Sequence, residues 1–483
     1  HDSRNNSRMF AERVADIFAS NGFTVYLFDA LRPTPELSFA IRELGCQSGV
    51  MVTASHNPKE YNGYKAYWTD GSQVTSPHDV NIIAEVAKVT DNAQVLTGKN
   101  AENIHILGEE FDQKYLAAIK ALSLSPESVA KYNDMKIVYT PLHGAGVKLV
   151  PQSLRNYGFN NIICVDEQMV LDGNFPTVKS PNPEEKSALE MAIALAKDID
   201  ADIVMATDPD ADRVGIAVKR KDGQWMLLNG NQTASVLTYY LVNQWKVNNK
   251  LIGKEFIVKT IVTSELIKDI AERNGVKSYD VLTGFKFIAD KIKELEGKEV
   301  FIGGGEESYG YMIGDFVRDK DAVSTCAMIA EIAAWAADNG KTFFDVLIDL
   351  YKEYGFYKED LLSMTKKGKS GNEEIKQMMV DYRSNPPKEI AGSKVVCIKD
   401  YQLQTSTNLQ TGDVESIVLP KSNVLQFFTE DGSKVSVRPS GTEPKIKFYF
   451  GVKGKLTNPE DFDAVNNALD SKIKAIKTSL NLE

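Results

Sequence analysis

Residues 203–213 read IVMATDPDADR, an apolar run followed by three closely spaced carboxylates. The apolar residues predict a strand from Ile203 to Ala206. Asp208, Asp210 and Asp212 follow it, and their like charges repel one another unless a cation compensates them. Ligand sets made only of oxygen favour Mg²⁺, Mn²⁺ or Ca²⁺ over zinc or copper. The stretch therefore predicts a strand that ends in a metal-binding loop.

An EF-hand and a solvated acidic turn are the two alternatives for this loop. In an EF-hand starting at Asp208, Arg213 would stand where the calcium loop needs a glycine. Lys219 would stand where that loop needs a bidentate glutamate, so an EF-hand is excluded. A solvated acidic turn stays open on this segment alone.

Length and composition indicate a soluble protein of several domains. Its 483 residues suggest about three to four domains, and 43% hydrophobic with 25% charged residues is typical of globular chains. The net charge of −10 argues against a nucleic-acid-binding protein, although a few local cations suffice for phosphate ligands. Four scattered cysteines without a CxxC pair indicate a reduced, cytoplasmic location. The most apolar stretch, 327–337, contains Glu331 and is too short to span a bilayer, so we expect no membrane partner.

The chain begins on His1 in polar, loop-like sequence, with no initiator methionine and no visible signal peptide. A domain normally brings a strand to such a loop. We therefore expect a first domain that lacks its opening N-terminal segment.

Strand-like and helix-like segments alternate over most of the chain, which predicts α/β domains. The expected strands are 23–28, 48–53, 136–139, 203–206 and 256–259, and the clearest expected helices are 35–44 and 184–197. Beyond a polar connector or exposed hairpin at 366–372, the expected strands are 395–398, 414–420, 424–429, 434–437 and 445–450, followed by a helix at 459–479. That order is typical of an antiparallel α+β domain.

The expected architecture is therefore three α/β domains with mixed sheets, followed by a C-terminal antiparallel α+β domain. The expected domains are 1–122, 123–228, 229–355 and 356–483, with boundaries uncertain by a few residues.

A second polar segment is TASHNP at 53–58, where a serine follows an expected strand and precedes Asn-Pro. The turn can expose the Ser55 hydroxyl. Adjacent Ser55 and His56 rarely form a nucleophile–base pair, and the G-x-S-x-G elbow of hydrolases is absent. A turn with a capping serine is the alternative interpretation.

Two further segments carry polar groups in glycine-rich surroundings. GGGEESYG at 303–310 places Glu306 and Ser308 two residues apart, where they can bind adjacent sugar hydroxyls. RPSGTEPK at 438–445 combines the arginine fork, two hydroxyls and a glycine, a suitable cradle for phosphate. A glycine-rich turn and a simple hairpin turn are the respective alternatives.

These four segments, in this order, resemble the α-D-phosphohexomutase family, which includes phosphoglucomutases and phosphomannomutases. The similarity continues through YNGYKAYW at 61–68, YTPLHGAG at 139–146, TGFKFI at 283–288 and VRDKDAV at 317–323, so it covers essentially the whole chain. Members of the family begin with a loop whose arginine reaches the transferring phosphate. No such loop precedes His1, which fits the incomplete first domain.

The resemblance implies an isomerase that interconverts glucose 1-phosphate and glucose 6-phosphate through a phosphoserine and a glucose 1,6-bisphosphate intermediate. Ser55 would carry the phosphoryl group, and Mg²⁺ would bind Ser55, Asp208, Asp210 and Asp212. The implied basic active-site residues are Lys65, Arg213 and Lys286, with His56 as a partner of Ser55. The implied sugar and phosphate ligands are Glu306, Ser308, Arg438, Ser440, Gly441, Thr442 and Lys445.

Several alternatives remain at this stage. The Glu-Glu-Ser form of the sugar loop favours glucose, but the same chemistry fits a phosphomannomutase or a phosphopentomutase. A non-catalytic sugar-phosphate-binding protein and a metal-dependent phosphatase belong to other classes. We expect a small sugar phosphate as partner, no nucleic acid, and a monomer or weak homodimer.

Overall fold

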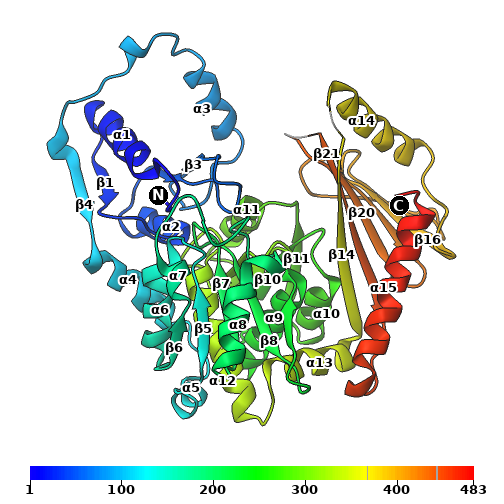
Figure 1. Ribbon diagram of the computed structural model, residues 1–483. Helices are drawn as coiled ribbons and strands as arrows, with labels where there is room; N and C mark the ends of the chain where they lie inside the picture. Colours follow the sequence, from blue (N-terminus) through cyan, green and yellow to red (C-terminus); the bar gives the residue numbers. More distant parts are fainter. Residues whose placement is uncertain (367, 442–443, 483) are drawn as a thin grey trace. The chain divides into compact units, whose positions relative to one another are not determined.

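The computed structural model describes residues 1–366, 368–441 and 444–482 (Figure 1). The chain divides into two units, each of which is described by itself. Unit 1 comprises His1–Lys259, Ala271–Tyr279 and Gly284–Val346. Unit 2 comprises Thr260–Ile270, Asp280–Thr283 and Leu347–Glu483.

The first part of unit 1 contains two separate pairs of short strands. Strands β1 and β4 pair in parallel, and β2 pairs with β3 antiparallel. An apolar cavity of about 400 Å³ is lined by side chains from α1, β1, α2 and β2. The elements are α1 Ser7–Ser20, β1 Val25–Phe28, α2 Thr34–Glu43, β2 Gly49–Val52, β3 Tyr64–Tyr67, α3 His78–Val86, η1 Asn92–Gln94, η2 Ala101–Asn103, β4 Ile104–Leu107 and α4 Glu109–Lys120.

The next part of unit 1 is built on a mixed five-stranded sheet in the order β6-β5-β7-β8-β9. Central β7 is buried along its whole length, which explains its uninterrupted apolar sequence. β5 and β7 are parallel, whereas β8 returns antiparallel to β7. The elements are α5 Pro126–Lys131, β5 Ile137–Thr140, α6 Gly146–Tyr157, β6 Ile162–Cys164, α7 Asp166–Met169, η3 Lys186–Leu189, α8 Glu190–Asp198, β7 Ile203–Thr207, β8 Val214–Lys219 and β9 Trp225–Leu228.

The helix expected from Glu184 starts later than its sequence pattern indicates. Residues 182–185 form a turn in which the Asn182 side-chain oxygen accepts a hydrogen bond from Glu184 N at 3.1 Å. A 3₁₀ turn, η3, follows, and the α-helix begins only at Glu190. The local asparagine turn competes with helix formation at this N-terminus.

A four-stranded mixed sheet, ordered β11-β10-β12-β13, forms the third part. β12 extends through Gly305, so the glycines expected in a turn lie in a strand paired with β10 and β13. A Cβ on Gly304 would lie 2.3 Å from the Val258 carbonyl oxygen. β12 can therefore lie this close to β10 only because residue 304 has no side chain. The elements of this stretch, in which most of α10 and α13 belongs to unit 2, are α9 Gly230–Val247, β10 Glu255–Thr260, α10 Glu265–Arg273, β11 Lys277–Val281, α11 Phe285–Leu295, β12 Val300–Gly305, β13 Tyr311–Ile313, α12 Ala322–Asp338 and α13 Phe343–Tyr354.

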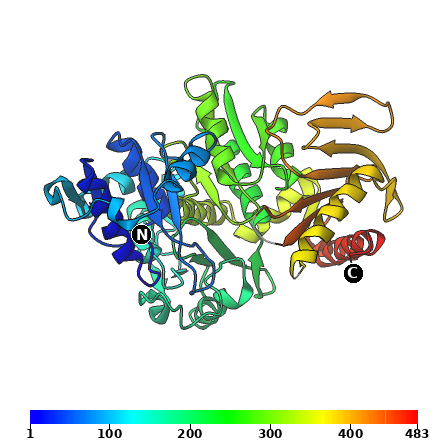
Figure 2. The same cartoon turned by 90° about the horizontal axis from the view of Figure 1, so that it is seen from above.

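Unit 2 is dominated by an antiparallel sheet ordered β14-β21-β20-β19-β16-β17-β18, with β15 paired to β16. Its strands lie side by side in Figure 2, and α14 and α15 pack against β21. The expected antiparallel α+β domain is confirmed. The elements are β14 Phe356–Thr365, α14 Gly368–Ser384, β15 Glu389–Ile390, β16 Ser393–Asp400, β17 Thr405–Asn408, β18 Val414–Ser416, β19 Leu425–Thr429, β20 Lys434–Pro439, β21 Lys445–Gly454, η4 Pro459–Asp461 and α15 Phe462–Ser479.

The expected polar connector at 366–372 is wrong for most of its length, because α14 begins at Gly368. Farther along this helix, Ile375 and Met379 are buried at 5% and 1% exposure. Their packing outweighs the weak helix propensity of the Gly- and Ser-containing start.

The most apolar helix, α12, carries one buried carboxylate. Glu331 is fully buried and accepts hydrogen bonds from the backbone of Leu124 and Ser125 and from the Ser123 and Tyr240 hydroxyls. The contacts join α12 to the start of α5 and to α9. No helix within the described ranges is both long enough and apolar enough to cross a membrane.

Replacing Glu331 with alanine should destabilise the protein by about 3 kcal/mol, because two backbone N–H groups and two hydroxyls would lose their acceptor. The free energy of unfolding, measured by urea denaturation, tests this. Glu110→Ala, an exposed glutamate on α4, is the control and should change stability by less than about 0.5 kcal/mol. Equal stability of the two variants would contradict the prediction.

Candidate active site

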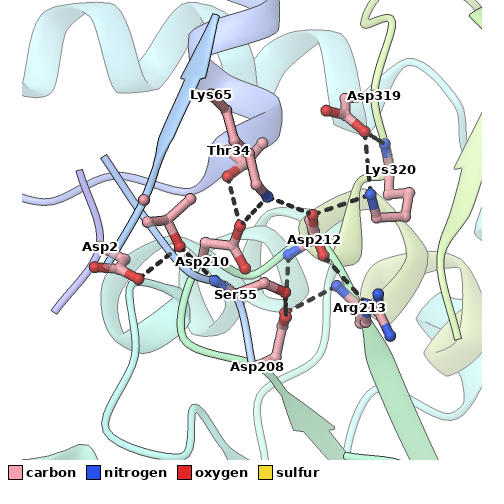
Figure 3. A network of polar contacts seen from close by, with 12 residues as sticks. Asp2, Thr34, Ser55, Lys65, Asp208, Asp210, Asp212, Arg213, Asp319 and Lys320 are labelled. Atoms are coloured by element: carbon pink, nitrogen blue, oxygen red, sulfur yellow. Dashed lines mark hydrogen bonds and ion pairs between the residues drawn. The ribbon is translucent and has the colours of Figure 1, made fainter. Parts of the chain in front are cut away.

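The three aspartates of the predicted metal loop lie together between β7 and β8 (Figure 3). Asp208 and Asp210 are fully buried and Asp212 is 1% exposed. One carboxylate oxygen from each lies within 4.8 Å of the others. The turn places Ala211 in the left-handed region at φ 51°. The loop after β7 therefore brings three carboxylates close together.

Burial and mutual repulsion dominate the electrostatics of this group. Burial and the charges of Asp210 and Asp212 hold the pKa of Asp208 well above its ordinary value. Burial and Asp210 raise the pKa of Asp212 in the same way. Burial also opposes ionisation of Asp210, but the nearby Lys65 ammonium outweighs it and lowers that pKa. The site holds more negative charge than its buried surroundings favour.

Among the described residues, Asp210 Oδ1 and Asp212 Oδ1 have no hydrogen-bond donor. Asp212 Oδ2 is paired instead with the ammonium groups of Lys320 and Lys65. Buried acceptors are normally satisfied, so the two Oδ1 atoms need a ligand that supplies positive charge. An all-oxygen donor set with unused lone pairs fits a hard divalent cation such as Mg²⁺.

Ser55 comes to the aspartates from the turn after β2. Its hydroxyl donates to Asp208 Oδ2 at 2.7 Å, and its Oγ lies 3.2 Å from His56 Nδ1. Its backbone takes a positive φ of 52°. Burial, aided by the Arg213 charge, lowers the pKa of His56 to about 3, so this imidazole is neutral near pH 7.

Two lysines from separate segments form ion pairs with the aspartates (Figure 3). Lys65, on β3, places Nζ 2.9 Å from Asp210 Oδ2 and 3.6 Å from Asp212 Oδ2. Lys320 places Nζ 3.1 Å from Asp212 Oδ2 and 3.3 Å from Asp319 Oδ1. Although burial opposes it, these carboxylates raise the pKa of both lysines above the ordinary value, so both stay charged.

Lys320 is a residue that sequence reasoning missed. The segment VRDKDAV was noted only for its similarity, and a lysine between two aspartates normally indicates a solvated charge cluster. Its side chain is in fact only 8% exposed. The buried pairing depends on tertiary contacts that the local sequence does not encode.

Arg213 connects the metal loop to the glycine-rich segment. Its backbone N–H donates to Asp208 Oδ1 at 3.0 Å, and its guanidinium donates to Glu184 at 2.8 Å. Arg213 also forms a β-bridge with Gly310. Glu184 is a second residue that the sequence analysis did not assign to the site.

The bridge brings Glu306 and Ser308 beside the metal loop. Glu306 is 6% exposed and accepts a hydrogen bond from Gly284 N at 2.9 Å. Burial raises its pKa to about 6. Ser308 is half-buried in the same turn. A Cβ on Gly310 would lie 2.0 Å from Lys320 Cδ, so the turn and this lysine are packed directly together.

The remaining predicted residues belong to α11 and to unit 2. Lys286 is at the start of α11, with its ammonium 5.4 Å from the centre of the Phe287 ring, and no described contact joins it to the aspartates. In unit 2, Arg438 lies near the end of β20, Lys445 begins β21, and Ser440 N donates to Lys445 O at 2.7 Å. Gly441 is exposed in the same hairpin, and Thr442 lies outside the described residues.

Family models for the phosphoglucomutase/phosphomannomutase domains match the chain in four consecutive segments. Domains I, II and III, each described as alpha/beta/alpha, match residues 1–93, 113–223 and 229–354, and the C-terminal domain matches 376–471. The chain belongs to this phosphoglucomutase/phosphomannomutase family. It is thus an isomerase of the phosphotransferase kind with the four-domain architecture, as expected. The domain boundaries near 123, 229 and 356 stay predictions.

Relatives in sequence and in fold agree with the assignment. A phosphoglucomutase of Staphylococcus aureus (strain N315) is 38% identical over 477 residues, which cover 98% of this chain and 84% of that protein. The structure of parafusin, a phosphoglucomutase from Paramecium, has a TM-score of 0.71 at 17% identity and covers 99% of this chain and 86% of that chain.

A more distant structural neighbour was solved with ligands. N-acetylphosphoglucosamine mutase of Aspergillus fumigatus, in complex with GlcNAc-6P and magnesium, has a TM-score of 0.53 at 12% identity, covering 96% of this chain and 94% of that chain. A variant of that enzyme was solved with glucose 1,6-bisphosphate. At this identity the likeness shows the fold alone.

Replacing Asp208 with asparagine should remove stabilisation by Mg²⁺. The variant should melt at or above the wild-type temperature in EDTA, because one of three repelling carboxylates is gone. Wild-type protein at about 100 times the Mg²⁺ dissociation constant should gain about 2.7 kcal/mol, and the variant far less. Thermal melts with EDTA or Mg²⁺ measure both effects.

Asp222→Asn, an exposed aspartate of the same part of unit 1, is the control and should keep the wild-type response. An undiminished Mg²⁺ shift in the Asp208 variant would contradict the assignment of this loop.

Proposed function

We propose that the chain interconverts glucose 1-phosphate and glucose 6-phosphate, with a phosphoryl group carried on Ser55. The observation that carries the proposal is the Ser55 hydroxyl, which lies 2.7 Å from a carboxylate of the buried aspartate group. Lys65, Lys320 and Arg213 pair with aspartates of that group. A hydroxyl in this position is next to compensating positive charge, which is the main requirement of phosphoryl transfer.

The cation site and the lysines would both offset negative charge during phosphoryl transfer. Mg²⁺ bound by Asp208, Asp210 and Asp212, together with an oxygen on Ser55, would withdraw charge from the transferring group. Lys65 and Lys320 keep their protons, because the aspartates beside them favour the charged form. They therefore act here as fixed cations rather than as bases.

The proposed reaction consists of two balanced phosphoryl transfers. The sugar O6 hydroxyl attacks phosphorus on Ser55, so that the O6–P bond forms, the Oγ–P bond breaks and the hydroxyl proton passes to a base. The resulting glucose 1,6-bisphosphate turns over while bound. Ser55 Oγ then attacks the 1-phosphoryl group, so that the Oγ–P bond re-forms and the P–O1 bond breaks. The base returns its proton to O1, and glucose 6-phosphate is left. Neutral His56, 3.2 Å from Ser55 Oγ, is placed to orient this oxygen.

Two further sets of residues would bind the substrate. Glu306 and Ser308 would accept and donate hydrogen bonds to sugar hydroxyls. Arg438, Ser440, Gly441, Thr442 and Lys445 of unit 2 would bind the phosphate that is not being transferred. Lys286 stays a candidate basic residue. The sugar preference for glucose rests on the Glu-Glu-Ser segment and on the names of the relatives.

A coupled assay tests the proposal. Glucose 1-phosphate, Mg²⁺ and a trace of glucose 1,6-bisphosphate should yield glucose 6-phosphate, read through its dehydrogenase, and EDTA should stop turnover. Ser55→Ala should lower kcat by at least about 10³-fold, because the acceptor of the phosphoryl group is lost. Ser48→Ala, at the residue just before β2, is the matched control and should stay within twofold of wild type.

The same assay separates the alternatives. Faster turnover of mannose 1-phosphate or ribose 1-phosphate would favour a phosphomannomutase or a phosphopentomutase. Free phosphate without an isomerised sugar would indicate a phosphatase, and binding without turnover a sugar-phosphate-binding protein. Full activity of the Ser55 variant would refute the phosphoserine.

Glu306 should impose a pH dependence on sugar binding. Its pKa near 6 means that the carboxylate, the better acceptor for sugar hydroxyls, is lost as the pH falls through 6. KM for glucose 1-phosphate should therefore rise between pH 7 and pH 5. The substrate phosphate also titrates near pH 6, so the comparison is with Glu306→Gln. That variant should have a higher KM at pH 7 and a flatter pH profile. If KM changed equally with pH in the wild type and in Glu306→Gln, a direct role for Glu306 would be contradicted.

A further inference from the structure

Arg4 makes an unusual set of contacts with the turn that carries Ser55. Its side chain is fully buried. One terminal nitrogen donates to the carbonyls of Pro58 and Tyr61, both at 2.9 Å. The other donates to the Ser55 carbonyl at 2.5 Å and to that of Asn57. One guanidinium thus holds four backbone oxygens of a single turn.

These four oxygens converge because the turn folds back on itself. The Pro58 carbonyl also accepts the Tyr61 N–H, but without Arg4 the other three would be partly buried acceptors that lose their donor, at a cost of about 1–3 kcal/mol each. Only arginine offers a rigid planar fork with enough donors for all of them, since lysine is a compact point charge. The contacts are therefore specific to this side chain.

Asp2 completes the arrangement from the other side of Ser55. Its Oδ2 lies 3.3 Å from Arg4 Nε and accepts the Thr53 hydroxyl at 2.6 Å. Thr53 Oγ1 in turn accepts the backbone N–H of Ser55 at 2.8 Å. In Figure 3, Ser55 lies among the three aspartates and Asp2 lies to the left of them. Both the N–H and the C=O of Ser55 are thus tied, directly or through Thr53, to the Asp2–Arg4 pair.

The held conformation is one that serine does not favour. A positive φ at a residue with a side chain costs about 1–2 kcal/mol and persists where the surroundings enforce it. Here it directs the Ser55 hydroxyl at Asp208 Oδ2. A displacement of about 1 Å between reacting groups can lower the rate about 10²-fold.

We propose that Arg4, oriented by Asp2, is a positioning residue that holds the Ser55 turn in its reactive conformation. The proposal rests on the proposed function of Ser55. Arg4 acts through the backbone of the turn and not on the substrate.

Three variants of the full chain test the proposal. In Arg4→Ala, kcat of the mutase assay should fall about 10²-fold while KM for glucose 1-phosphate changes less than threefold. Added guanidinium should restore part of the lost kcat, because it can refill the space between the four carbonyls. Arg4→Lys should stay close to the alanine variant. Arg8→Ala is the control: Arg8 donates to the carbonyls of Phe28 and Asp29, away from the Ser55 turn, and its removal should leave kcat within twofold.

Hydrogen exchange gives a readout that does not need activity. Within the turn, Asn57 N donates to Ala54 O and Tyr61 N donates to Pro58 O. Exchange at 54–62 should be slow in the wild type and in Arg8→Ala, and at least tenfold faster in Arg4→Ala. Added guanidinium should slow it again in Arg4→Ala.

The outcomes separate the two claims. An inactive wild type with the expected exchange pattern would count against the proposed function and leave the positioning role of Arg4 supported. Wild-type kcat in Arg4→Ala, or wild-type exchange at 54–62 in that variant, would overturn the positioning role. A rise in KM with unchanged kcat would overturn it as well, because it would place Arg4 in substrate binding.

Discussion

The repulsion among three buried carboxylates is the constraint on which the rest of the site depends. Asp208, Asp210 and Asp212 follow one strand, and within their own loop Arg213 compensates only part of their negative charge. Cations must therefore come from elsewhere in the chain, and Lys65 and Lys320 do so from two distant segments. Ion pairs at the aspartates consequently join several segments of unit 1 before any substrate is present.

Different contacts fix the turn that carries Ser55. The aspartate group attracts the Ser55 hydroxyl, whereas Asp2 and Arg4 fix its backbone. Charge compensation and loop geometry are thus handled by separate residues. Neutral His56 adds a polar contact beside Ser55 without adding a further charge to the site.

The sequence predicts the parts of this structure that local pattern determines. The apolar run before Asp208 predicts β7, and the alternation of segments predicts the α/β architecture and the antiparallel end of the chain. Lys320 was missed because its role depends on an ion pair with Asp212, which is far away in the sequence. The helix α14 and the glycine strand of β12 were misjudged because packing and close strand approach outweigh residue propensity there. The family resemblance contributed the roles of the residues, which no pattern alone supplies.

The contact between Gly310 and the Lys320 stem has a consequence for how sugar preference can change. Because the stem occupies the space that any side chain at 310 would need, the backbone of the proposed sugar-binding turn and the lysine paired with Asp212 must move together. Reshaping that backbone would therefore disturb the charge balance of the aspartate group. Diversification towards new sugars is therefore easiest through the side chains at 306 and 308, which can vary while the shared frame stays fixed.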